Sequence, residues 1–170
     1  MCIRDRLYAG RAGGNFYNKQ GGGGNYLCMP EVPEYSDTLR YKPGSQSHSE
    51  IFGVEYEFPI VGTHDHNVPC ALCSASTRVI VVMIPARASC PTGWTREYYG
   101  YLMTQSDKWN PSNGQRRTTF ECVDKDQDSV PGSQANMNGA VLYEVEANCN
   151  GLPCPPYNNH KELNCVVCTK

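Results

Sequence analysis

The sequence predicts a mainly β fold of two tandem homologous subdomains, stapled by disulfides, with short strands, long loops and little helix. Three observations lead to this prediction. Ten cysteines supplement a chain of 170 residues that is only 39% hydrophobic, which is little material for a core. Sixteen glycines and twelve prolines divide the chain into short segments, and no segment carries a helical apolar stripe. Four short fragments recur in the same order in the second half.

Four short apolar or aromatic segments are the clearest expected strands. Residues 78–84 are β-branched and apolar, and residues 94–103 are rich in aromatic side chains. Residues 141–145 show a strand-like alternation, and residues 163–167 form a short apolar run. Clusters of glycine and proline separate these segments, as is typical of strands joined by turns and loops.

The recurring fragments indicate an internal duplication. The pairs are YAG at 8–10 with YYG at 98–100, NYLC at 25–28 with TFEC at 119–122, YEF at 56–58 with YEV at 143–145, and PCALC at 69–73 with NCVVC at 164–168. Their offsets differ only by loop-sized amounts, so we expect a first repeat with a connector at 7–88 and a second repeat at 89–170.

The first six residues are expected to lie outside the native fold. Residues 1–6 look like the translation of an adapter sequence used in preparing sequencing libraries, so we exclude them from the fold prediction. Nine cysteines then remain, an odd number. Repeat alignment places the natural partner of Cys73 upstream of Leu7, so we expect this partner to be missing. Cys2 lies close to the aligned position by chance.

Charge and composition exclude several classes of function. The formal net charge is −2, so no basic field attracts nucleic acid. No apolar run reaches the roughly 18 residues that a membrane-spanning helix needs, so we expect no membrane insertion. The cysteine content favours a secreted protein with structural disulfides, and a four-cysteine zinc site is the weaker alternative.

Two polar motifs are candidates for metal binding. His64 and His66 would present both imidazoles on one face if they lay on a strand, although a polar loop is the simpler interpretation. Asp124, Asp126 and Asp128 alternate like the start of a calcium loop, but the glycine and glutamate that complete an EF-hand are missing. We therefore expect no cofactor, with calcium as the ion to test.

We expect no enzymatic activity. The sequence has no G-x-S-x-G motif, and every cysteine has a structural role in the predicted framework. An aromatic group at Trp94, Tyr98, Tyr99 and Tyr101 could stack on a sugar or fill a protein interface. The same side chains could equally form the core of a small β domain, and the sequence leaves both interpretations open.

Several long motifs, in order along the chain, carry a resemblance to a known family. They are AGRAGG at 9–14, NYLC at 25–28, HDHNVPC at 64–70, CPTGWTREYYGYLM at 90–103, CVDKD at 122–126 with VPGS at 130–133, and CNGLPCPPY at 149–157. Over residues 7–170 the chain resembles the C-terminal non-collagenous domain of invertebrate short-chain, spongin-type collagens. More distantly it resembles the non-collagenous domain of type IV collagen, which is also an internal duplication. The resemblance implies a secreted extracellular matrix protein, β-rich subdomains and self-association as a homotrimer through a collagenous region.

The disulfide prediction combines local geometry with this resemblance. The turn-rich stretch between Cys149 and Cys154 predicts that these two cysteines pair with each other. Neither C-x-x-C pair should close on itself, because positions three apart on a strand face opposite sides. The nested pattern of type IV collagen implies the remaining bonds, Cys28–Cys70, Cys90–Cys168 and Cys122–Cys165. Exchange of partners within a C-x-x-C pair, or between the repeats, is the alternative.

The sequence therefore leaves two candidate functions open. The first is a structural module that aligns three chains, because collagen strands have no hydrophobic core to bring them together. The second is a lectin-like or metal-dependent ligand-binding module that uses the aromatic group or a metal ion.

Overall fold

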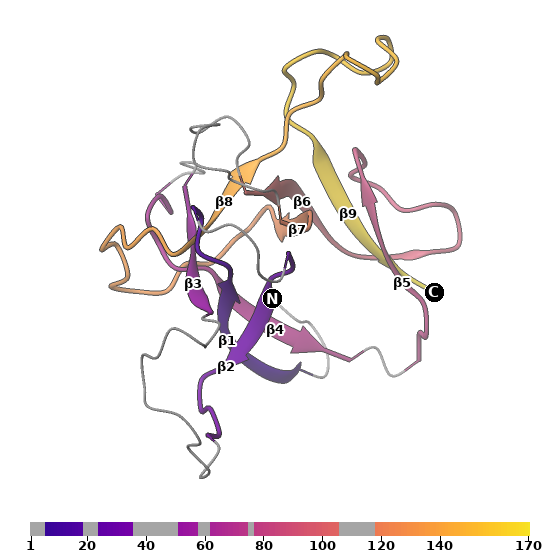
Figure 1. The fold of residues 1–170 in the computed structure, drawn as a ribbon. Coiled ribbons are helices and arrows are strands. Elements are labelled where there is room, and N and C mark those ends of the chain that lie inside the picture. Colours follow the sequence, from indigo (N-terminus) through magenta and orange to yellow (C-terminus); the bar gives the residue numbers. More distant parts are fainter. Residues whose placement is uncertain (1–5, 19–23, 36–50, 58–61, 75–76, 106–117) are drawn as a thin grey trace.

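The computed structural model describes residues 6–18, 24–35, 51–57, 62–74, 77–105 and 118–170, which contain β-strands and no helix. The strands are β1 (Arg6–Gly14), β2 (Leu27–Pro30), β3 (Phe52–Tyr56), β4 (Pro69–Cys73), β5 (Val81–Pro85), β6 (Thr95–Thr104), β7 (Glu121–Asp124), β8 (Ala140–Glu144) and β9 (Asn164–Thr169). The predicted mainly β fold is confirmed (Figure 1). No helix in these residues is long and apolar enough to cross a membrane.

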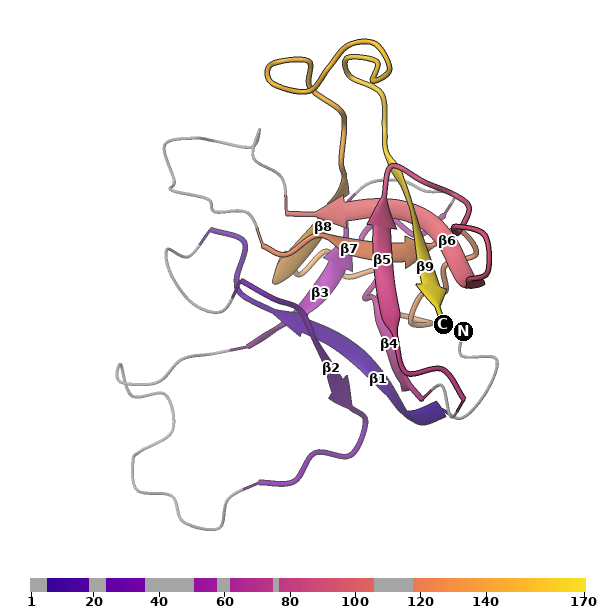
Figure 2. The same cartoon turned by 90° about the vertical axis from the view of Figure 1, so that its right-hand side faces the viewer.

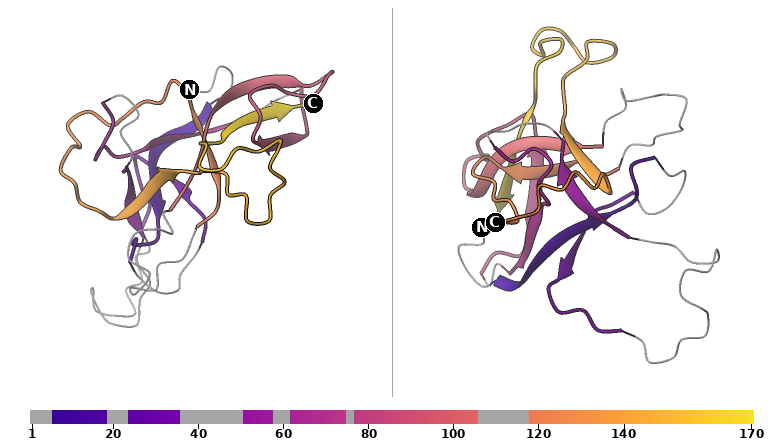
Figure 3. Two further views of the ribbon diagram at one scale, coloured as in Figure 1. Left: turned by 90° about the horizontal axis from the view of Figure 1, so that it is seen from above. Right: turned by 90° about the vertical axis from the view of Figure 1, so that its left-hand side faces the viewer.

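The strands form one curled sheet with the order β2-β1-β3-β8-β6-β9-β5. In addition, β4 pairs with β1 and β7 pairs with β6, so β1 and β6 each contact three strands. The pairing of β3 with β8 is parallel and joins the two parts of the sheet, whereas the other pairings are antiparallel. Figures 2 and 3 show the first-half strands β1 and β2 lying apart from β5 and β9.

β1 and β6 hold their neighbours in the same register. Gly10 lies opposite Cys70 of β4, and Gly100 lies opposite Cys165 of β9. Both pairings contain a register shift, which ends at Tyr8 in β1 and at the corresponding Tyr98 in β6. The two groups of strands, β1-β2-β4 and β6-β7-β9, therefore share their register and the position of their irregularity.

The correspondence between the first and second halves of the chain continues beyond these strand groups. At one place the corresponding residues differ from those that the sequence fragments pair. The Val68 N–H donates to the Val54 carbonyl at 2.9 Å, and the Leu163 N–H donates to the Val145 carbonyl at 2.9 Å. These bonds align Val54 with Val145, four residues later than the YEF and YEV fragments suggest. Residue 58 of the first fragment lies outside the described residues.

In each half of the chain, a disulfide joins the two strands that flank the central strand, which is β1 in the first half and β6 in the second. Cys28–Cys70 connects β2 to β4, and Cys122–Cys165 connects β7 to β9, each with a Cα–Cα distance of 5.6 Å. Cys90–Cys168 and Cys149–Cys154 complete the four predicted pairs, all of which are present. Several disulfides are typical of secreted or extracellular proteins.

Cys73 is disulfide-bonded in the structure. The prediction that its natural partner lies upstream of Leu7 stays a prediction, because residues 1–5 lie outside the described residues. Cys2 is among the residues that the structure does not describe.

The core lies where β3 and β8 meet. Its buried members are Val54, Tyr56, Val68, Met103, Ala140 and Leu142. Glu55, between two core residues, is only 1% exposed, and its carboxylate accepts N–H bonds from Met137 at 3.0 Å and Asn138 at 2.8 Å. A buried carboxylate is stable only when such donors satisfy it, so Glu55 fixes the chain segment that leads into β8.

The predicted aromatic group divides between packing and the surface. Tyr101 packs against the core, and the partly buried Tyr98 hydroxyl donates to the Cys122 carbonyl at 3.1 Å. The ring of Tyr99 instead lies 4.9 Å from the Arg96 guanidinium carbon. Tyr98 and Tyr101 therefore serve the fold, whereas Tyr99 contacts a charged side chain.

Buried tyrosines predict a loss of stability in alkali. Burial raises the pKa of Tyr26, Tyr98 and Tyr143 to about 12 each, against about 10 for a tyrosine in an unfolded chain. The folded state therefore holds these protons more tightly. Their contribution to stability is complete below about pH 10 and is lost as the pH rises through about 12.

We expect the urea midpoint to be constant from about pH 8 to about pH 10 and to fall steeply above that. Absorbance at 295 nm, recorded on the folded protein, follows the titration directly. Tyr98→Phe should reduce the steepness of the fall, while substitution of the exposed Tyr35 should not. A midpoint that stays constant through about pH 11.5 would contradict this prediction.

Candidate metal centre

The structure places His64 and His66 in a turn, not on a strand. In residues 64–66, Asp65 has a φ of 62° and the His66 N–H donates to the Thr63 carbonyl at 3.0 Å. The side-chain parity of a strand, on which the prediction of a shared face depended, therefore does not apply to this pair. His66 Nδ1 lies 3.0 Å from the His64 carbonyl.

The acidic stretch at 124–128 does not form a calcium loop either. Asp124 Oδ1 accepts the Asp126 N–H at 3.1 Å, and Lys125 Nζ lies 2.6 Å from Asp126 Oδ1. Asp128 uses its carbonyl to accept a bond from the Tyr56 hydroxyl. The carboxylates of Asp124 and Asp126 are thus engaged locally. Asp124, Asp126 and Asp128 do not form a group of converging ligand atoms within the described residues.

A different set of residues converges in their place. Glu57 directly follows β3, while His64 and Asp65 belong to the turn that leads towards β4. Each of the three offers one ligand atom, and these atoms all lie within 4.8 Å of one another. His64 Nε2 is 3.6 Å from Asp65 Oδ1. We call Glu57, His64 and Asp65 the metal cluster.

Backbone bonds fix the positions of the metal cluster. The Glu57 N–H donates to the Leu142 carbonyl of β8 at 3.1 Å, which holds the end of β3 against the second half of the sheet. The Asp65 N–H donates to the Tyr56 carbonyl at 2.8 Å, which returns the turn to the same place. Backbone hydrogen bonds alone therefore hold these two chain segments side by side.

The electrostatics of the metal cluster favour a positive partner. Glu57 Oε1 and Asp65 Oδ1 are both enclosed from solvent, and neither accepts a hydrogen bond from the described residues. Burial raises the pKa of Glu57, and the neighbouring carboxylate of Asp65 raises it further, while His64 acts in the opposite direction. Two enclosed carboxylates without donors are costly unless a proton or a cation joins them.

Sequence reasoning found His64 but missed Glu57. In the sequence Glu57 is one of two alternating glutamates, with Glu55, and nothing distinguishes their roles. The fold gives Glu55 two backbone donors and leaves Glu57 beside the turn. Only the tertiary return of residues 63–66 to the end of β3 could have revealed this difference.

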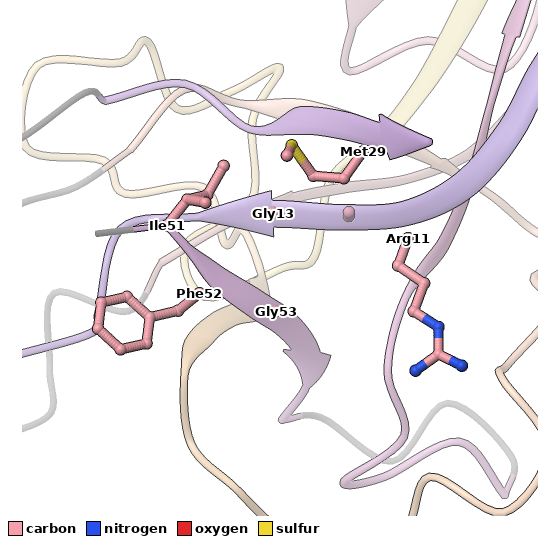
Figure 4. A pocket seen from close by; sticks show the side chains of 7 residues that line it. Arg11, Gly13, Met29, Ile51, Phe52 and Gly53 are labelled. Atoms are coloured by element: carbon pink, nitrogen blue, oxygen red, sulfur yellow. The ribbon is translucent and has the colours of Figure 1, made fainter. Parts of the chain in front are cut away.

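A shallow hollow of about 200 Å³ lies over β1, beside β2 and β3 (Figure 4). Met29 and Ile51 lie on one side of β1 across Gly13, and Arg11 points to the other side. Gly13 keeps this space open, since a side chain there would meet Met29 and Ile51 within 3 Å. The hollow is apolar and brings no titratable cluster together.

No family model matches the chain, and no solved structure matches it.

Proposed function

We propose that this chain is a secreted, non-enzymatic structural module of the extracellular matrix that associates with further copies of itself, as a homotrimer, and so aligns collagenous chains. The resemblance to non-collagenous domains of short-chain collagens supports the collagen part of the proposal. An exposed apolar strand edge supports the self-association, and this observation carries the proposal. Collagen strands have no core of their own, so a globular end can supply alignment and local concentration.

The exposed edge is β5 and the residues that precede it. β5 lies at the end of the strand order, beside β9 (Figures 1 and 2). Val79, Ile80 and Val81 are 94%, 50% and 65% exposed. Soluble monomers usually protect such an edge with charge, proline or a covering loop. β5 contains no charged residue, and its one proline, Pro85, is its last residue. An open β-branched edge is therefore evidence for a partner.

A second open edge suggests why the assembly would close into a ring. By register, β4 is the counterpart of β9, yet within the described residues β4 pairs only with β1. Leu72 of β4 is 45% exposed. Two different edges on one chain favour a head-to-tail contact, and such contacts form rings when the rotation closes. The shared registers also support the inference that the chain contains two copies of one unit.

The decisive measurement is sedimentation over a wide concentration range. We expect the wild-type protein to form trimers and Val81→Lys to weaken association by more than about tenfold, because a lysine blocks strand addition at an edge. Because Val81 is exposed, the unfolding midpoint of the Val81→Lys variant should equal that of the wild type. Val32→Lys is the matched control, since Val32 is 83% exposed but lies outside both edges.

Two results would overturn the proposal. A wild-type protein that is monomeric at every concentration would remove the assembly function and favour the alternative, a lectin-like or metal-dependent binding module. Equal association of the Val81→Lys and Val32→Lys variants would show that the β5 edge is not the interface. Full-length transcripts test the collagen part separately, and we expect them to encode Gly-X-Y repeats.

A further inference from the structure

We propose that Glu57, His64 and Asp65 bind one divalent transition-metal ion of the Zn²⁺ class and leave at least one coordination position open. This site goes beyond the assembly function and does not depend on it. Its ligand set, two carboxylates and one imidazole, matches the nitrogen and oxygen ligands that Zn²⁺ takes from proteins.

The distances fit such an ion after a small contraction. Zn²⁺ lies about 2.0–2.2 Å from its nitrogen and oxygen ligands, so two ligand atoms in a tetrahedral site are about 3.3 Å apart. His64 Nε2 and Asp65 Oδ1 are already 3.6 Å apart, and all three ligand atoms lie within 4.8 Å of one another. The His64 side chain is 49% exposed, so it has room to move towards the carboxylates.

The enclosed oxygens give a second, independent reason. Glu57 Oε1 and Asp65 Oδ1 are shut off from solvent and accept no hydrogen bond from the described residues, and the imidazole of His64 comes no closer to Asp65 Oδ1 than 3.6 Å. Comparable carboxylates elsewhere in the chain are satisfied, such as Glu55 by two backbone N–H groups and Asp126 by Lys125. A cation between Glu57 and Asp65 would supply the missing interaction for both atoms at once.

The ligand types also select the ion. Ca²⁺ takes six to eight oxygen ligands, as in an EF-hand loop, and an imidazole nitrogen is a poor substitute for one of them. Three protein ligands leave a tetrahedral ion with a fourth position for water or for a group from another molecule. We therefore expect preference for Zn²⁺ or Co²⁺ over Ca²⁺, contrary to the ion suggested by the acidic stretch.

The test uses the untagged full chain after treatment with a chelator. We expect calorimetry to give one Zn²⁺ per chain, and Co²⁺ to produce visible absorption bands typical of a tetrahedral site. Glu57→Gln and Asp65→Asn should each lower Zn²⁺ affinity by about tenfold or more, since loss of one ligand weakens the site. Both changes preserve side-chain shape, and circular dichroism with disulfide mapping verifies that each variant folds.

The controls address the two motifs that the sequence suggested. His66→Ala and Asp126→Asn should leave the Zn²⁺ affinity unchanged, because neither residue belongs to the metal cluster. Three outcomes would overturn the proposal: no Zn²⁺ binding at millimolar concentration, unchanged affinity in both folded cluster variants, or binding of Ca²⁺ in preference to Zn²⁺. Sedimentation of the metal-free protein measures self-association without the ion, so the metal site and the assembly function are tested separately.

Discussion

Replacing Gly100 with alanine is expected to destabilise the domain by about 3 kcal/mol or more, at the upper end of what overpacking costs. A Cβ atom at this position would lie 1.9 Å from the Val123 carbonyl oxygen and 2.5 Å from the Lys125 nitrogen. Both atoms belong to the backbone, so no side-chain rotation can relieve the overlap. The β7 strand would have to move away from β6.

The cause of this close approach is the disulfide that bridges over β6. Gly100 pairs with Asp124 of β7 on one side and with Cys165 of β9 on the other. Strands on either side of a third lie about 9.6 Å apart in a flat sheet, twice the usual spacing. The Cα atoms of Cys122 and Cys165 are only 5.6 Å apart. The sheet must therefore fold sharply at Gly100.

The first half of the chain repeats this arrangement and offers an independent test. A Cβ atom on Gly10 would lie 1.7 Å from the Met29 carbonyl oxygen, beneath the Cys28–Cys70 bond. Gly10→Ala should therefore behave like Gly100→Ala. Gly53→Ala is the matched control, because Gly53 also lies in a strand but nothing lies within 4 Å of its added Cβ.

Urea unfolding with the disulfides intact measures all three variants. We expect Gly53→Ala to stay within about 1 kcal/mol of the wild type, as for an ordinary exposed strand substitution. Failure of Gly100→Ala to fold while Gly53→Ala folds would support the argument. Equal midpoints for the two variants would show that the close approach at β6 does not constrain the fold.

Glycine also explains why β1 was hard to predict. The apolar and aromatic segments that contain β5, β6, β8 and β9 were all expected, with β5 beginning at Val81 rather than at residue 78. In contrast, β1 contains AGRAGG, which reads as a loop by composition. Its glycines leave room for side chains and backbone in and beside β2, for Ile51 before β3 and for Ala140 of β8. That requirement exists only after the sheet has curled.

The disulfides and the metal cluster also differ in how far local rules could predict them. Strand parity excludes closure of the C-x-x-C pairs, and this rule holds because Cys70 with Cys73, and Cys165 with Cys168, do lie on strands. Strand parity does not apply to His64 and His66, because Asp65 occupies the left-handed region and turns the chain. A local rule predicts only as well as the local structure on which it depends.

Removing the Cys122–Cys165 bond is expected to lower the free energy of unfolding by about 4 kcal/mol, from the chain-entropy model. Its cysteines are 43 residues apart in sequence. The Cys149–Cys154 pair spans only 5 residues, and the same model gives about 2 kcal/mol for its loss. Urea unfolding of the two double alanine variants should therefore give clearly different midpoints.

Comparing the Cys28–Cys70 bond with Cys122–Cys165 separates the effect of loop entropy on stability from the effect of burial. Its sequence separation is 42 and its Cα–Cα distance is 5.6 Å, so its entropic contribution should equal that of Cys122–Cys165, whose separation is 43. Cys165 is fully buried, whereas Cys28 and Cys70 are partly exposed. We therefore expect the Cys122→Ala/Cys165→Ala variant to lose about 1–2 kcal/mol more than Cys28→Ala/Cys70→Ala, from the cavity that it leaves. Equal losses would show that burial of this bond contributes nothing, and a larger loss for Cys149→Ala/Cys154→Ala than for either would contradict the entropic account.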